Sequence, residues 1–256
     1  MKKLNLKQVE GYVNKNIVIF HQNKIKPLEK QSLKKLLKKK NPYLFRAKNI
    51  TIASDFIQNL LEATISSSEE KIFGNFLEEL AIYISSKTAN GRKSSATGID
   101  LEFNHDNIHH IVSIKSGVNW GNSSNQIKLA QDFLKAQTVL KQSNRTLNVQ
   151  PILGICYGKT KTNTWKDVAL KLVGQSFWYL LSKNENLYTD IIEPLGYKAK
   201  QHNDQFNKEK NRLLNLFTQE FLRDFCDNGV INWKKIVQFN SGNLKPPKPS
   251  KPTKSP

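Results

Sequence analysis

Four polar side chains on two neighbouring stretches of the sequence could do chemistry together. Asp100 and Glu102 stand two residues apart in a run where apolar and polar residues alternate, which predicts a strand with both carboxylates on one face. Ser113 and Lys115 share a face of a second predicted strand in the same way. Residues 105–107 predict the turn that joins the two strands into a hairpin. If the two polar faces coincide, two carboxylates and an ammonium meet at the sheet.

This set of groups is what hydrolysis of a phosphodiester requires. Carboxylates bind Mg²⁺, the ion polarises the phosphate, and a lysine can orient the attacking water or lower its pKa. The alternative is a hairpin whose solvent face carries Asp, Glu and Lys in weak cross-strand pairs. The residue types alone leave both interpretations open.

The net charge of the chain favours a polyanionic partner. The 256 residues contain 40 Lys and Arg against 21 Asp and Glu, which gives +19 and a pI near 9.8. An AT-rich genome also raises lysine content, but it would raise glutamate too, and here the acids lag far behind. Basic surfaces attract phosphate backbones, so nucleic acid is the expected partner. Charge cannot distinguish a protein that binds nucleic acid from one that cuts it.

Other features of the sequence exclude several classes of protein. No stretch approaches the ~18 apolar residues of a membrane span, and the lysines after Met1 are not followed by the apolar segment of a signal peptide. Cys156 and Cys226 are too few for a disulfide framework or a thiolate zinc site. We therefore expect a reduced, cytoplasmic protein.

The order of predicted elements places the hairpin in a small sheet. The first fifty residues look helical and very basic, and Ser66-Ser67-Ser68 predicts a helix break, with Ser67 and Glu70 as a capping box for a core helix that reaches Ile84. After the hairpin come a helix over 123–142, a strand over 149–157, and several helices over 165–238. This order predicts an α/β (α+β) fold, with a small central mixed sheet flanked by helices and helical N- and C-terminal elaborations. We expect one domain over 1–242, with its core at about 66–160, and a disordered Pro/Lys tail over 243–256.

Several segments resemble a known family. Gly98-Ile99-Asp100 and residues 111–117 resemble the active-site strands of the PD-(D/E)xK nuclease superfamily, where Asp100 matches the first acid and Lys115 the motif lysine. Residues 41–49, 67–78 and 113–124 are similar to segments of one group of bacterial type II restriction endonucleases, the PmeII type. The resemblance covers most of residues 1–242. It implies a restriction-endonuclease-like core and Mg²⁺ as the cofactor, with the carbonyl of Ile114 as a further metal ligand.

The sequence departs from the superfamily pattern at Ser113, where a second acid normally stands. The resemblance implies that another carboxylate takes its place. Glu78 on the preceding helix is the first choice, followed by Asp132 on the helix after the hairpin and then by Glu102. Glu70 is a weaker alternative. The metal ligands predicted by this argument are Asp100, Glu78, Asp132 and Ile114.

Two neighbouring features have less specific interpretations. His105, His109 and His110 lie in or beside the hairpin turn without a thiolate, and a structural role is the better interpretation. Residues 117–124 form a polar, Gly-rich loop that could contact the DNA backbone, with Trp120 either stacking on bases or anchoring the loop.

The sequence thus predicts a Mg²⁺-dependent type II restriction endonuclease that hydrolyses double-stranded DNA at a specific sequence. Asp100, Lys115 and Glu78 are the predicted catalytic residues. Because both strands must be cut, we expect a homodimer, and a cognate DNA methyltransferase is the expected genetic partner. Two alternatives stay open: a non-catalytic nucleic-acid-binding protein with the same fold, which Ser113 favours, and a repair or recombination nuclease that reads DNA structure.

Overall fold

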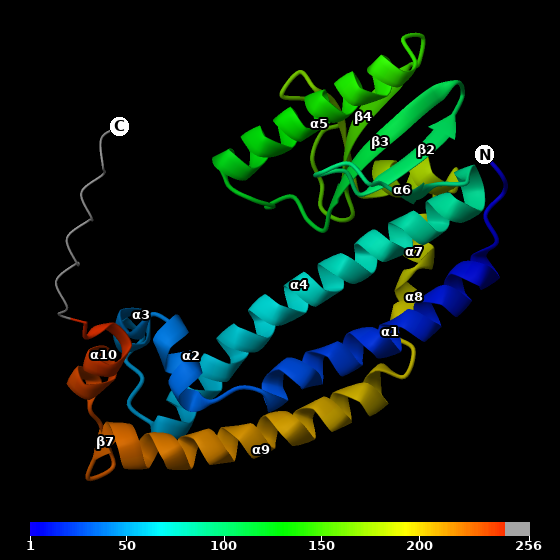
Figure 1. The fold of residues 1–256 in the computed structure, drawn as a ribbon. Coiled ribbons are helices and arrows are strands. Elements are labelled where there is room, and N and C mark those ends of the chain that lie inside the picture. Colours follow the sequence, from blue (N-terminus) through cyan, green and yellow to red (C-terminus); the bar gives the residue numbers. More distant parts are fainter. Residues whose placement is uncertain (244–256) are drawn as a thin grey trace, which may run out of the picture. The chain divides into compact units, whose positions relative to one another are not determined.

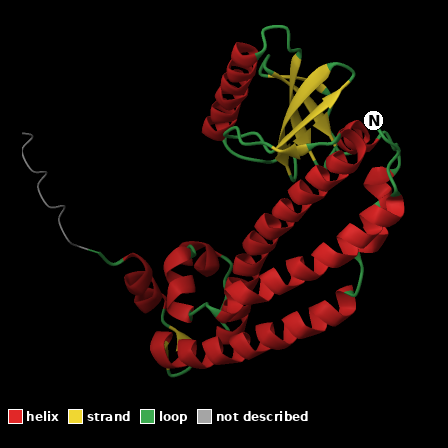
Figure 2. Cartoon of the chain, turned by 45° about the vertical axis from the view of Figure 1, so that its right-hand side comes forward, coloured by secondary structure: helices red, strands yellow, loops and turns green. Residues whose placement is uncertain are grey.

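The computed structural model describes residues 1–243 of the chain, with helices flanking one mixed sheet (Figures 1 and 2). The predicted fold class is therefore confirmed. The helices are α1 (Leu6–Glu29), α2 (Leu33–Lys39), α3 (Pro42–Ala47), α4 (Ala53–Ala89), α5 (Ser123–Ser143), α6 (Gln175–Ser182), α7 (Leu187–Asp190), α8 (Ile192–Leu195), α9 (Ala199–Phe225) and α10 (Trp233–Ser241). The strands are β1 (Arg92–Lys93), β2 (Leu101–His105), β3 (Ile108–Lys115), β4 (Val149–Ile155), β5 (Asn163–Trp165), β6 (Ala169–Val173), β7 (Cys226–Asp227) and β8 (Val230–Ile231). Apart from residue 243, the predicted Pro/Lys tail lies outside the described residues.

The central sheet has the strand order β1-β2-β3-β4-β6-β5. The pairs β1·β2, β2·β3 and β5·β6 are antiparallel, whereas β3·β4 and β4·β6 are parallel. Helix α5 is the crossover that joins the parallel strands β3 and β4, since such strands need a long connection. Leu101 pairs with Val112 and Glu102 with Ile111, so the hairpin has the register that places Asp100 opposite Ser113.

Helices cover both faces of this sheet. Leu101, Val112 and Ile152 pack on one face with apolar residues of α1, α4 and α6. Ile111 and Leu153 pack on the other face with Phe133 of α5. The buried strand β3 therefore carries apolar residues on both sides, as is usual for a central strand with covered faces. Ser113 and Lys115 lie near the C-terminal end of β3.

Two predictions about the elements are wrong. The three serines at 66–68 do not break the helix, because α4 continues through them and the Ser67 hydroxyl donates to the Ala63 carbonyl one turn earlier. Glu70 is consequently an exposed residue in mid-helix and not a capping residue. The region predicted as purely helical, 165–238, also contains strands, because β6 pairs with β5 and extends the sheet, and β7 pairs with β8. The turn between β5 and β6 uses Lys166 and Asp167 at positive φ, without the Asn-Gly or Gly residues that usually predict a hairpin.

The chain divides into two compact units. Unit 1 comprises residues 1–24 and 68–205 and contains the sheet, and the described part of unit 2 comprises residues 25–67 and 206–243. Unit 2 has its own apolar core, in which Phe56 stacks on Phe221 at 4.7 Å between ring centroids. Helices α1, α4 and α9 each contribute residues to both units. The single domain expected over 1–242 stays a prediction.

Candidate active site

The expected meeting of polar side chains occurs at the end of β3. Asp100 directly precedes β2, and its backbone N–H donates to the Val112 carbonyl at 2.8 Å, which holds it opposite Ser113. Its Oδ2 accepts the backbone N–H of Ile114 at 2.6 Å and the hydroxyl of Ser113 at 3.2 Å. Oδ1 has no hydrogen-bond or ion-pair partner among the described residues. Asp100 is therefore fixed through one oxygen and leaves the other available.

The Lys115 ammonium is held next to Asp100 and Ser113. Its Nζ donates to the Ser113 hydroxyl at 2.9 Å and to the Ile114 carbonyl at 3.0 Å, and it lies 3.8 Å from Asp100 Oδ2. The ammonium also lies 5.5 Å from the ring centroid of Trp120, within the range of a cation–π interaction. Trp120 in turn packs on Trp165 at 5.8 Å. Sequence reasoning missed this link between the loop and the lysine, since no residue spacing predicts it.

Ser113 occupies the slot of the missing acid and joins the two charged groups. It is completely buried, and its hydroxyl donates to Asp100 and accepts from Lys115. A carboxylate here would lie beside that of Asp100, at a fully buried position. A hydroxyl satisfies both neighbours without adding a second negative charge.

Glu78 lies close enough to Asp100 and Lys115 to interact with their charges. Burial raises the pKa of its carboxyl, and the negative charge of Asp100 raises it further. Lys93, at 3.6 Å from Glu78 Oε1, and Lys115 oppose these effects. Helix α4 approaches β3 one turn earlier, where a Cβ on Gly74 would lie 3.6 Å from the Ser116 side chain. Two carboxylates that raise each other's energy are a suitable place for a cation.

The other three candidate acids have different surroundings. Asp132 contacts Gly98, whose φ is +78° and whose missing Cβ would lie 2.6 Å from Asp132 Oδ2. It lines a cavity of about 440 Å³ together with Glu102 and Lys135. No hydrogen bond or ion pair joins Asp132 to Asp100 or Lys115 in the described part of the chain. Glu70 is exposed on α4.

Glu102 is engaged by a structural network. Its carboxylate accepts from the Ser94 hydroxyl and from the Arg92 guanidinium at 3.4 Å, and it lies 3.7 Å from His109 Nε2. The other ring nitrogen of His109 is 2.7 Å from Asn104 Oδ1. Although Glu102 shares the strand face of Asp100, its partners draw it away from Lys115.

The remaining histidines of the hairpin are held by local contacts. His110 stacks on Phe103 at 4.7 Å, and burial, with the charges of His105 and His109, lowers its pKa to about 4. His105 Nε2 lies 3.1 Å from Asp106. Within residues 1–243, no group of three or more His, Cys, Asp and Glu side chains is placed to hold a metal ion. A metal bound near Asp100 would therefore take backbone or water oxygens as further ligands.

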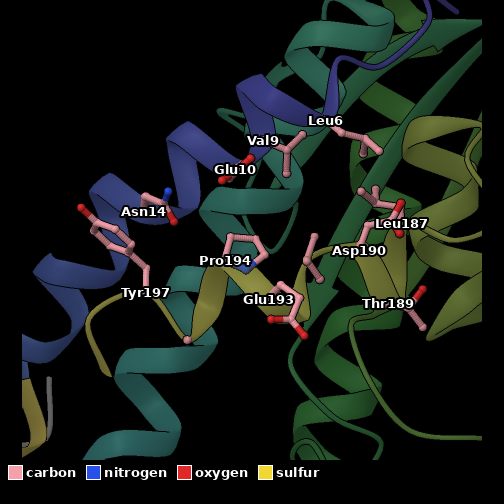
Figure 3. Close-up of a pocket in the computed structure, with 12 residues that line it drawn as sticks. Leu6, Val9, Glu10, Asn14, Leu187, Thr189, Asp190, Glu193, Pro194 and Tyr197 are labelled. Carbon is pink, nitrogen blue, oxygen red and sulfur yellow. The ribbon is translucent and has the colours of Figure 1, made fainter. Parts of the chain in front are cut away.

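A larger cavity of unit 1 lies apart from these residues. It measures about 630 Å³ and is lined by residues of α1, α7 and α8, including Glu10, Asn14, Asp190 and Glu193 (Figure 3). None of the predicted catalytic residues is among those that line it. Size alone does not make this cavity the centre of the chemistry.

The sequence matches the model of a protein family. That family is described as type II restriction endonuclease EcoO109I, and the match covers residues 7–203, more than three-quarters of the sequence. The chain belongs to this family. It is therefore a type II restriction endonuclease, a nuclease that acts on DNA, and the matched segment includes Glu78, Asp100, Ser113, Lys115 and Asp132. No curated protein sequence matches the chain. No helix in the described part of this endonuclease is long and apolar enough to cross a membrane.

Proposed function

We propose that this endonuclease cuts double-stranded DNA at a specific sequence through a Mg²⁺-dependent site of the PD-(D/E)xK type. The observation that carries the proposal is the contact group at the end of β3. Asp100 and Lys115 both bind Ser113 and the Ile114 backbone, and Glu78 lies within electrostatic range. The PmeII-type group is the finer assignment that we propose on the segments quoted above.

The donors around Asp100 fit Mg²⁺. Mg²⁺ prefers oxygen ligands, uses one or two carboxylates and keeps several waters. Asp100 offers Oδ1, Glu78 offers a carboxylate whose ionisation the site disfavours, and Ile114 offers its carbonyl. We propose that Asp132 lies near the metal but does not bind it directly, because its side chain packs against Gly98. When bound, Mg²⁺ would polarise the phosphate and lower the pKa of a water molecule.

Lys115 supports the attack on phosphorus. Its ammonium is held at three oxygens and beside an aromatic ring, so it is positioned before substrate arrives. It would orient the attacking water and stabilise negative charge that develops on the phosphate. Asp100 and Ser113 hold Lys115 in place. In-line displacement by this water leaves a 5′-phosphate, as the resemblance to the superfamily implies.

The substrate implies further partners. A duplex has two strands of opposite direction, and a homodimer with two equivalent sites can cut both. A sequence-specific nuclease that acts in the cytoplasm also endangers the DNA of its own cell. We therefore propose a cognate DNA methyltransferase as the genetic partner that protects those sites.

Incubation of the purified protein with unmethylated plasmid or phage DNA and Mg²⁺ tests the proposal. We expect discrete fragments, no cleavage in EDTA, and fragment ends that a ligase accepts. A smear, or cutting only at branched DNA, would instead support a repair nuclease. A mobility shift without cleavage would support the non-catalytic alternative, to which the serine at position 113 gives some weight.

A further inference from the structure

Among the described residues, net positive charge is denser in unit 2 than in unit 1. The 81 described residues of unit 2 (25–67 and 206–243) contain 15 Lys and Arg against 7 Asp and Glu, or +8, whereas the 162 residues of unit 1 contain 21 against 14, or +7. The most one-sided stretch is residues 30–54, which has eight basic residues and no acidic one. This stretch includes α2 and α3. The charge excess is therefore concentrated on particular elements.

Helix α2 presents its lysines to solvent while its apolar side is covered. Leu33, Leu36 and Leu37 are at most 3% exposed and belong to the core of unit 2. Lys35 and Lys39 are exposed and lie one turn apart on one side of the helix. Because the leucines are already buried, α2 has no free apolar face with which to enter a lipid surface. The exposed side is suited to a hydrophilic anion.

The stability of the helix does not explain these lysines. Lys35 lies in the first turn of α2, where the helix dipole disfavours a positive charge, and that turn has no acidic residue. Lys35 and Lys39 also repel each other at i,i+4 spacing. Both effects favour an external anion that neutralises the pair.

Neighbouring cations differ in whether the protein neutralises them. Lys34 pairs with Asp224 at 3.4 Å, and on α9 Arg212 pairs with Glu209 at 2.7 Å. In contrast, Lys35 and Lys39 have no ion-pair partner among the described residues. Lys48, the C-cap residue of α3, has its Nζ 5.9 Å from the ring centroid of Phe45 and no ion-pair partner among the described residues.

Helix α10 brings two more exposed lysines next to these helices. It packs against both α2 and α3, and Asn240 donates to the carbonyls of Leu37 and Lys40 at the end of α2 (Figure 1). Its first turn again has no acidic residue. Six exposed cations of these three helices and of the α3 C-cap, none of them in an ion pair with a described residue, make up what we call the basic helix cluster: Lys35, Lys39, Arg46, Lys48, Lys234 and Lys235.

We infer that the basic helix cluster is a docking surface for the phosphate backbone of duplex DNA, separate from the active-site residues of unit 1. The inference rests on the proposed function, since it names how the same substrate is held. A second copy of the chain is a poor occupant, because two such surfaces facing each other would repel. Lysine contacts to phosphates give affinity without sequence preference. The cluster thus increases the affinity for DNA regardless of sequence, and selection of the cleavage site takes place elsewhere.

The test compares two full-length variants that lose the same charge. One carries Lys35→Gln, Lys39→Gln and Lys48→Gln, and the control carries Lys3→Gln, Lys7→Gln and Lys141→Gln, all exposed positions of unit 1. Affinity for a duplex is measured in EDTA between about 50 and 200 mM salt. Each lost phosphate contact lowers the slope of log K against log salt by about 0.9, so we expect a loss of up to ~3 in the first variant. The control should keep the slope of the parent.

A second measurement needs no variant and so does not depend on folding. Amine-reactive labelling of the parent protein, read by mass spectrometry, should slow at Lys35, Lys39 and Lys48 when duplex DNA is added, and not at Lys141. Equal slopes in the two variants, or unchanged labelling at the three lysines, would overturn the docking surface. If the parent cuts DNA while either result is found, only this inference fails. If the parent neither binds nor cuts DNA, the proposed function fails as well.

Discussion

Asp100 and Glu102 stand two residues apart on the same strand face, yet their carboxylates have different hydrogen-bond partners. Glu102 accepts hydrogen bonds from Arg92 and Ser94 and lies 3.7 Å from His109 Nε2. Asp100 has one oxygen bound by Ile114 and Ser113, with Lys115 at 3.8 Å from it, and one oxygen without a partner among the described residues. A second carboxylate, Glu78, lies within electrostatic range of Asp100. An acid that the fold has neutralised contributes to stability. An acid that is fixed but left partly uncompensated is prepared for a cation and a substrate.

The largest expected effect is the loss of Lys115. Lys115→Ala should lower the single-turnover rate of DNA cleavage by roughly 10³-fold, since a positioned group that assists proton transfer contributes about 10²–10⁴. Binding of the duplex in EDTA should change little. Lys135→Ala, which removes a lysine near Glu102, is the matched control and should cut like the parent. Equal rates for the two variants would remove Lys115 from the site.

Removal of Glu78 should affect activity and stability in opposite directions. The pKa of Glu78 is raised in the folded protein, so its ionisation destabilises the fold as pH rises above the ordinary pKa of glutamate. Without metal at pH 8, Glu78→Gln should therefore melt at a higher temperature than the parent, and this difference should vanish in acid. Cleavage in Mg²⁺ should fall by about 10²-fold. A variant that is both less stable at pH 8 and fully active would show that Glu78 is a structural acid.

Trp120 should act on Lys115 through its ring. A cation–π contact is worth about 0.5–2 kcal/mol, so Trp120→Leu should lower the single-turnover cleavage rate by roughly tenfold and leave the affinity for DNA in EDTA unchanged. Trp120→Phe retains a ring and should recover most of the rate. If the leucine variant loses affinity for DNA while its single-turnover rate stays that of the parent, Trp120 contacts the substrate instead.

The smallest effect on activity is expected at Glu102. Glu102→Gln removes the charged acceptor of the hydrogen bonds from Ser94 and Arg92 and should lower the free energy of unfolding by about 1 kcal/mol. The Arg92 side chain is 77% exposed, so little of this loss comes from that ion pair. Cleavage should stay within about twofold of the parent, as is usual for a change that leaves the reacting groups in place. Denaturant unfolding and cleavage assays on the same preparation measure both quantities.

The hairpin was predictable because its signals are local. Alternation around Asp100 and Lys115 sets which side chains share a face, and a short polar turn sets the register. The helix over 123–142 and the strand over 149–157 were also close to α5 and β4. These elements have long, regular patterns, and they place the two residues that matter most.

What the sequence could not predict depends on contacts between distant residues. The partners of Glu102 and Asp132 come from segments whose packing no spacing reveals. Strand β5 is too short to show a period, and β6, in which Lys171 is the one polar residue, shows no alternation. Serines such as those at 66–68 can either cap a helix or lie inside one. Which of the two occurs depends on whether the residues on both sides of the serines pack as one continuous helix. The uneven charge of the two units also became visible only when the fold divided the chain.

The central claim is that Asp100, and not Glu102, serves the reaction. It is tested most directly by the Mg²⁺-dependent cleavage of one duplex by Asp100→Asn and Glu102→Gln, measured side by side under single-turnover conditions. Both substitutions remove one charge and keep the shape of the side chain. The account predicts a loss of at least ~10³-fold for Asp100→Asn, the scale of losing a group that holds both metal and lysine, and near-parental cleavage for Glu102→Gln. Equal losses, or a greater loss for Glu102→Gln, would contradict it.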